Sequence, residues 1–127
     1  MPKTTTAVSQ ENLILFDWLT FTSHCDSPET IMQLLGLKDV PWQRMDKGRN
    51  GYKGRYFFEN ISILYDGAEN MGVCVDLTGT GCRAFETYST INWTELMEIL
   101  FYNSGDYNVT RLDMAFDDHT GILDIDQ

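Results

Sequence analysis

The chain has 127 residues, 43% of them hydrophobic and 13% aromatic, so it can bury a core and is not a disordered tail. No run of about 18 apolar residues occurs, which excludes a membrane-spanning helix and predicts no membrane partner. The net charge of −10 argues, taken alone, against nucleic acid, because phosphate contacts need lysine and arginine. The three cysteines lack zinc-type spacing, which indicates reduced thiols and a cytoplasmic location.

The charge is distributed unevenly along the chain. Residues 1–55 carry a net charge of +1, whereas residues 56–127 carry −11. Five of the nine basic residues lie in one glycine-rich segment: Arg44, Lys47, Arg49, Lys53 and Arg55. An acidic body with one basic segment suits a protein that grips DNA at one place and holds cations at another, and we predict phosphate contacts for these five side chains. The alternative is a solvated hairpin kept soluble by its charges.

The start of the chain predicts a lead-in, a strand and a helix. Residues 1–12 are polar and are expected to be a flexible lead-in. Leu13–Thr22 is rich in aromatic and branched residues, as is typical of a central strand. Its only charge, Asp17, falls on the face of Leu19 because side chains alternate along a strand. A helix is then expected to begin at Pro28, behind a serine N-cap.

The middle of the chain predicts a loop, three strands and a short helical turn. Asp39–Gly54 is expected to be a loop that carries most of the basic segment. Strands are expected at Arg55–Glu59, Ile61–Asp66 and Met71–Thr78, since branched and aromatic residues alternate there with polar ones. The glycines of Gly79–Glu86 predict that the chain leaves the last strand and enters a short helical turn.

A second helix and a last strand complete the pattern. Asn92 and Glu95 have the spacing of a capping box, and Gly105 can end the helix. Val109–Asp118 follows and alternates with a period of two. One of its faces carries Arg111, Asp113, Ala115 and Asp117, and the other carries Leu112, Met114 and Phe116. A charged strand face indicates either a site or a wet face with an Arg–Asp pair, and both interpretations stay open.

The order strand, helix, three strands, helix, strand predicts an α+β fold with a largely antiparallel sheet and helices packed on one face. In such a fold the first and last strands are expected to be neighbours at the centre of the sheet. Asp17 and Asp113 would then face each other, with Glu86 nearby and Asp117 in reserve. Carboxylate oxygens are the ligands of hard cations, so these residues predict a magnesium or manganese site. Arg111 is the alternative partner for these carboxylates.

Three motifs carry a family resemblance: D-W-L-T-F-T, L-T-G-T-G-C-R-A-F-E and T-R-L-D-M-A-F-D-D, in this order. Together they resemble the N-terminal portion of the replication initiation factor family, the Rep_trans-type rolling-circle initiators of plasmids, phages and integrative conjugative elements. The resemblance spans residues 13–127 and implies a DNA strand transferase. In such an enzyme a tyrosine attacks a phosphodiester at the replication origin, assisted by a divalent cation. Origin DNA, a host helicase and a second copy are the expected partners, and Arg83 and Arg111 join the predicted DNA-binding residues.

The chain departs from the family pattern in one respect. The nucleophilic tyrosine is expected downstream of the Asp-rich strand, and no tyrosine follows Tyr107. Residues 13–127 are therefore expected to be an N-terminal domain or half-domain of a truncated initiator, one that has part of the cation site and lacks the nucleophile. The alternatives are a non-catalytic DNA-binding module or a truncated remnant of an initiator, and a structural domain whose acidic strand is merely solvated.

Overall fold

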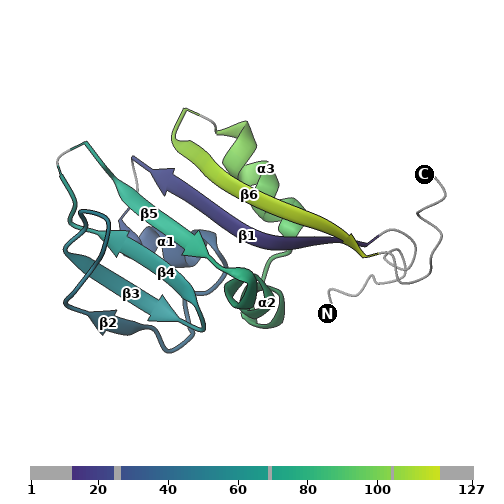
Figure 1. Cartoon of the computed structure of the whole chain (residues 1–127), viewed down its shortest axis with the longest axis horizontal. Helices are drawn as coiled ribbons and strands as arrows, with labels where there is room; N and C mark the ends of the chain where they lie inside the picture. The colour runs from purple at the N-terminus through teal and green to yellow at the C-terminus, as the bar shows by residue number, and fades with distance from the viewer. Residues whose placement is uncertain (1–12, 25–26, 69, 104, 118–127) are drawn as a thin grey trace.

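The computed structural model describes residues 13–24, 27–68, 70–103 and 105–117. Six strands form one sheet in the order β2-β3-β4-β5-β1-β6, and every neighbouring pair is antiparallel (Figure 1). The elements are β1 (Leu13–Ser23), α1 (Pro28–Leu34), β2 (Gln43–Met45), β3 (Gly54–Phe58), β4 (Ile61–Tyr65), β5 (Val73–Leu77), α2 (Gly79–Tyr88), α3 (Trp93–Tyr102) and β6 (Tyr107–Asp117).

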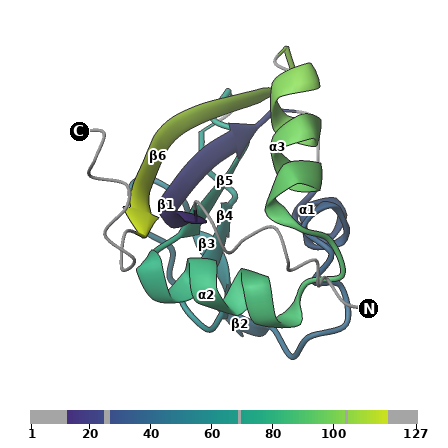
Figure 2. The same ribbon diagram turned by 90° about the vertical axis from the view of Figure 1, so that its right-hand side faces the viewer.

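The predicted α+β class is confirmed, and α1 and α3 pack on one face of the sheet. Figure 2 shows α1 and α3 together on one side, with α2 crossing the end of the sheet where β5 stops. The covered face is apolar because Leu19, Phe21, Ile63, Val75 and Leu77 all point into it and are completely buried. Their burial against the helices supplies the hydrophobic stabilisation of the domain.

The position of β6 corrects one expectation. β6 pairs with β1 as predicted, but within the described residues it is the outermost strand and not a central one. β5 occupies the other side of β1, where Leu77 pairs with Leu19. Because β1 pairs with β5 on one side and with β6 on the other, the Asp-rich strand β6 lies at the edge of the described sheet.

Each helix starts at a side chain that accepts a hydrogen bond from the first turn. Ser27 caps α1, Thr78 caps α2, and Asn92 forms the predicted capping box of α3 with Glu95. α2 has ten residues and is a regular helix where only a short turn was expected. Gly81 is required there, because a Cβ at this position would lie 2.4 Å from the carbonyl oxygen of Asn60.

The basic loop, defined here as residues Asp46–Lys53, is more ordered than expected. The short strand β2 precedes it, inside the segment predicted to be a loop. Within it, Asn50 and Gly51 both have positive φ, and the Tyr52 amide donates to the Arg49 carbonyl, which makes a tight turn of the hairpin kind. The turn fixes the position from which the Arg49 side chain extends.

A bulge in β1 changes which side chains share a face. Opposite β6, Phe16 pairs with Met114 and Trp18 pairs with Asp113, so Asp17 is the extra residue. Phe16 stacks on Trp93 of α3, at 4.6 Å between ring centroids, and lies on the helix side. Trp18 points to the opposite side, although regular alternation places it with Phe16.

No helix of the described part of the chain is long and apolar enough to cross a membrane.

Candidate nucleic-acid interface

The open face, defined as the sheet face turned away from α1 and α3, carries a polar network centred on Asp76 of β5. The Trp18 indole N–H and the Thr20 hydroxyl of β1 both donate to its Oδ1, each at 2.8 Å. Nη2 of Arg49 donates to its Oδ2, also at 2.8 Å. Only 16% of the Asp76 side chain is exposed, so these hydrogen bonds form in a partly desolvated environment. There they are stronger than in water and fix the orientation of the donor side chains.

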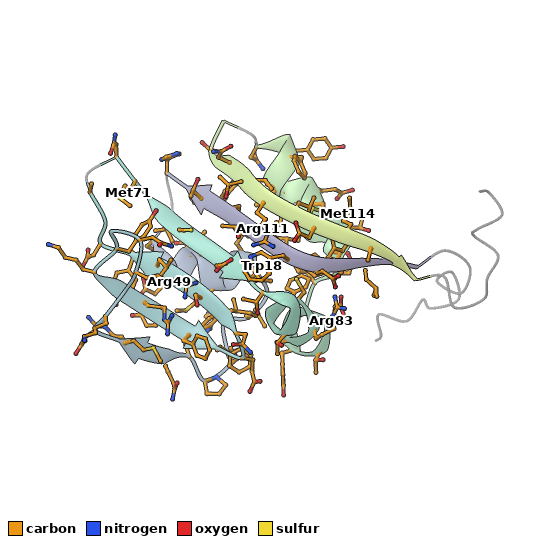
Figure 3. All side chains as sticks on the ribbon, in the orientation of Figure 1. Trp18, Arg49, Met71, Arg83, Arg111 and Met114 are labelled. Atoms are coloured by element: carbon orange, nitrogen blue, oxygen red, sulfur yellow. The ribbon has the colours of Figure 1, made fainter. Side chains whose placement is uncertain are left out.

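Arg111 of β6 lies on the same face and is held from two directions. Its guanidinium carbon is 3.9 Å from the centroid of the Trp18 ring, which is close cation–π contact. Its Nε and Nη2 both donate to Oδ2 of Asp113, at 3.2 and 2.8 Å. The hydrogen bond to Asp113 is the main reason that the pKa of Arg111 is raised. Figure 3 shows Trp18, Arg49 and Arg111 on the face turned to the viewer.

The remaining residues of the basic segment are divided between the two faces. Arg55 lies on the open face, where its guanidinium is 5.1 Å from the Phe57 ring centroid and contacts the sulfur of Met45. Arg44 takes the other side of the hairpin and donates from Nε to the Tyr65 hydroxyl, which raises the pKa of Arg44. The two lysines of the basic loop, Lys47 and Lys53, are exposed. The five predicted phosphate contacts therefore do not form one surface.

Arg83 of α2 is engaged with its own protein. Its Nη2 donates to the carbonyl of Phe16, which adjoins the bulge of β1, and to Oε2 of Glu86 at 2.9 Å. Nη1 lies 4.0 Å from a carboxylate oxygen of Asp17. Glu86 also accepts the indole N–H of Trp93 at 2.8 Å. This arrangement ties α2 and α3 to β1.

The expected cluster of Asp17, Glu86 and Asp113 is wrong for the described residues. Asp17 and Glu86 share Arg83, whereas Asp113 pairs with Arg111 on the open face. No group of three metal-ligating side chains occurs in the part of the chain that the structure describes. The bulge explains the error, because it takes Asp17 out of register and sets Trp18 opposite Asp113. Asp17 and Glu86 share one guanidinium and Asp113 pairs with another, so as they stand these carboxylates do not fit a divalent cation. The reserve ligand, Asp117, has a side chain outside what the structure describes.

The helix side has an apolar hollow of about 450 Å³ between β1 and α3. Phe16, Trp93, Met97, Phe101 and Tyr102 contribute to its lining, and Glu98 is the charged residue at its rim. Among the described residues the hollow is lined by one glutamate and by no lysine or arginine, which does not suit a phosphate backbone. The open face is therefore the better candidate for nucleic acid.

Sequence reasoning missed the two residues that organise the open face. Regular alternation assigns Trp18 to the face of Phe16, and it marks Asp76 only as a polar position in an alternating strand. A carboxylate within a strand of buried valines and leucines is costly to bury unless it is bonded. That cost was the available signal for Asp76, but no sequence pattern pairs it with Trp18, 58 positions away.

Comparisons with known proteins agree on one family. The family described as "Rolling Circle replication initiation protein N-terminal domain" matches residues 13–100. NicK of Bacillus subtilis (strain 168), which is named as a proposed DNA relaxase, is 28% identical over 118 residues, which cover 88% of this chain and 33% of NicK. The solved structure of a rolling-circle replication initiator protein from Geobacillus stearothermophilus is 34% identical, with a TM-score of 0.74. The match covers 83% of this chain and 44% of that one, so the chain spans less than half the length of either relative.

Proposed function

Because this chain belongs to the family of rolling-circle replication initiation protein N-terminal domains, we propose that it binds replication-origin DNA through the open face of its sheet. The basic loop and the edge strand β6 flank this face. Lys47, Arg49 and Lys53 come from the loop, and Arg111 comes from β6. Several finer points stay predictions: a source in a plasmid, phage or conjugative element, a cytoplasmic location, a helicase partner and a homodimer.

The observation that carries the proposal is the convergence of Arg49 and Arg111 beside Trp18. Cationic groups next to an aromatic ring form the usual composition of a surface that tracks a nucleic-acid strand. The two arginines come from elements 62 positions apart in sequence, and the Asp76 network brings them together. The net charge of −10 does not exclude this function, because binding depends on the local potential of a surface and not on the sum over the chain. Arg49 and Arg111 are each paired with a carboxylate, so the exposed Lys47 and Lys53 supply the net positive charge.

The test is the salt dependence of DNA binding by the 127-residue chain. Fluorescence anisotropy with a labelled 30-nucleotide single strand and the corresponding duplex gives the dissociation constant at several salt concentrations. Lys47→Met with Lys53→Met should weaken binding and lower the slope of log K against log salt by about one unit for each phosphate that the variant no longer binds. The control is Lys38→Met, because Lys38 is exposed and follows α1, away from the open face. Equal slopes for the loop variant and wild type would contradict the proposal.

A second candidate function is strand nicking by this chain alone, which the family resemblance suggests. Two tyrosines near the basic loop are poor nucleophiles, since burial raises the pKa of Tyr52, and burial together with Glu29 raises the pKa of Tyr56. A nucleophile needs the opposite shift or an adjacent base. Neither of these two tyrosines is activated by its surroundings, and DNA binding is the function that we propose for these 127 residues. The cation expected from the resemblance stays a prediction.

A further inference from the structure

Arg111 has a more restricted geometry than a phosphate-binding arginine needs. The Trp18 ring lies against its guanidinium, with 3.9 Å between the guanidinium carbon and the ring centroid, and Asp113 limits its rotation by accepting from Nε and Nη2. Trp18 is itself fixed by its hydrogen bond to Asp76. Three contacts from β1, β5 and β6 therefore orient one half-exposed side chain.

The part of the guanidinium that remains available is its outer edge. Arginine has five N–H donors in a planar fork, and Asp113 takes those of Nε and one on Nη2. Within the described residues, the Nη1 group has no hydrogen-bond acceptor in contact. Such an edge, held in one plane, matches a pair of acceptors that lie side by side.

The nearby carboxylates decide which pair of acceptors fits. Asp113 is 2.8 Å from the guanidinium, and Asp76 lies on the same face beside Trp18. Asp113 offsets the charge of Arg111 and Asp76 offsets that of Arg49, so this edge has no net positive charge to attract a phosphate. A guanine base offers two acceptors, O6 and N7, on one edge and carries no charge.

We infer that Arg111 recognises a guanine base in the bound DNA, with Trp18 and Asp113 as its positioning residues. The inference rests on the proposed DNA-binding function and adds a source of sequence preference to it. It also gives Asp113 a role, which is to hold an arginine and not a cation. Lys47 and Lys53 supply contacts that are independent of sequence, whereas Arg111 supplies a contact that depends on one base.

The experiment selects DNA from a library and then alters single atoms of the guanine. The 127-residue chain selects from a randomised library, presented as duplex and as single strand, and guanines in the enriched sequence are replaced one at a time by 7-deazaguanine. This base lacks the N7 acceptor. At one position the replacement should weaken binding about tenfold, as expected for a bidentate arginine–guanine contact. Inosine at that position keeps O6 and N7 and should bind like guanine.

Three variants separate base recognition from phosphate contact. Arg111→Met should abolish the 7-deazaguanine penalty, and Arg111→Lys should reduce it, because an ammonium lacks the planar fork. The matched control, Lys47→Met, should weaken binding to all sequences and keep the penalty. A thermal melt of each variant shows that it is folded.

The outcomes are distinguishable. An unchanged penalty in Arg111→Met overturns the inference, as does a wild-type protein that shows no penalty at any guanine. In both cases salt-dependent binding that Lys47→Met and Lys53→Met weaken leaves the proposed function standing. If the wild-type chain shows no salt-dependent binding at all, both proposals fall.

Discussion

Arg49, on the basic loop, and Asp76, on β5, form an ion pair with 2.8 Å between Nη2 and Oδ2. The pair connects a loop at one edge of the sheet to a strand near its middle. Asp76 accepts hydrogen bonds from three donors, because Trp18 and Thr20 both donate to its other oxygen. The position of the basic loop, the orientation of Trp18 and the stack on Arg111 thus depend on one carboxylate.

Asp76→Ala should lower the free energy of unfolding by about 2 kcal/mol, because it leaves the Trp18 and Thr20 donors without their acceptor. Asp76→Asn is the matched control, since an amide oxygen can accept both bonds while the ion pair with Arg49 is removed. That pair is partly exposed, so its removal alone should cost less than about 1 kcal/mol. Urea unfolding of both variants measures the difference. Equal losses of stability in the two variants would show that the charge, and not the acceptor, stabilises the fold.

Arg83→Met should destabilise the domain by roughly 1–2 kcal/mol, a value reduced for partial exposure of the side chain. The change removes the donor to the Phe16 carbonyl at the β1 bulge and the pair with Glu86, while the methionine keeps most of the apolar stem. Lys38→Met makes the same change of charge at an exposed position and should have little effect. Urea unfolding that gives the same free energy for both variants would contradict a structural role for Arg83.

Local patterns predicted most of the elements, because their causes are local. Caps such as Ser27 and Asn92 act within one turn of helix, and the branched and aromatic residues that predict β1 lie within that one segment. The order of strands depends on contacts between distant segments, which explains why β6 was expected at the centre. The α+β class could be predicted, but the edge position of β6 could not.

The candidate site was harder to predict because one bulge changes several side chains. The extra residue at Asp17 puts Phe16 and Trp18 on opposite faces, and no pattern in Leu13–Ser23 signals it. Arg111 and Asp113 were correctly placed on one face, since they are two residues apart in a stretch of β6 that pairs without a shift. Their pairing was an open alternative from the sequence, whereas the stack on Trp18 requires the register of two strands.

The two cysteines that the structure describes should react slowly with thiol reagents in the folded protein. Burial raises the pKa of Cys74 to about 11 and that of Cys82 to about 12, so at pH 8 almost no thiolate is present. In a Cys25→Ser background, a chromogenic disulfide reagent should titrate both thiols quickly in urea and slowly in buffer. Fast reaction of the folded protein at pH 8 would contradict the burial of these side chains.

The same shifts predict how stability changes at alkaline pH. In the unfolded chain the thiols lose their protons near pH 9, whereas in the folded chain Cys74 keeps its proton until about pH 11. The unfolded state then binds fewer protons than the folded state, so the free energy of unfolding falls as pH rises from about 9 to 11. Cys74→Ala should make this fall shallower, which urea unfolding at a series of pH values measures. If the free energy of unfolding falls equally steeply in the variant, titratable groups other than Cys74 cause the fall.

With magnesium or manganese present, the 127-residue chain should form no 5′-phosphotyrosine adduct with DNA that carries its enriched sequence. The described carboxylates Asp17, Glu86 and Asp113 are paired with arginines, and no tyrosine follows Tyr107. Electrophoresis under denaturing conditions detects such an adduct as a shifted labelled strand. Fusion to the remaining part of a longer relative should restore it, which shows that the DNA and the assay are competent. An adduct formed by the chain alone would contradict the prediction, and Tyr107→Phe and Tyr88→Phe would then identify the nucleophile.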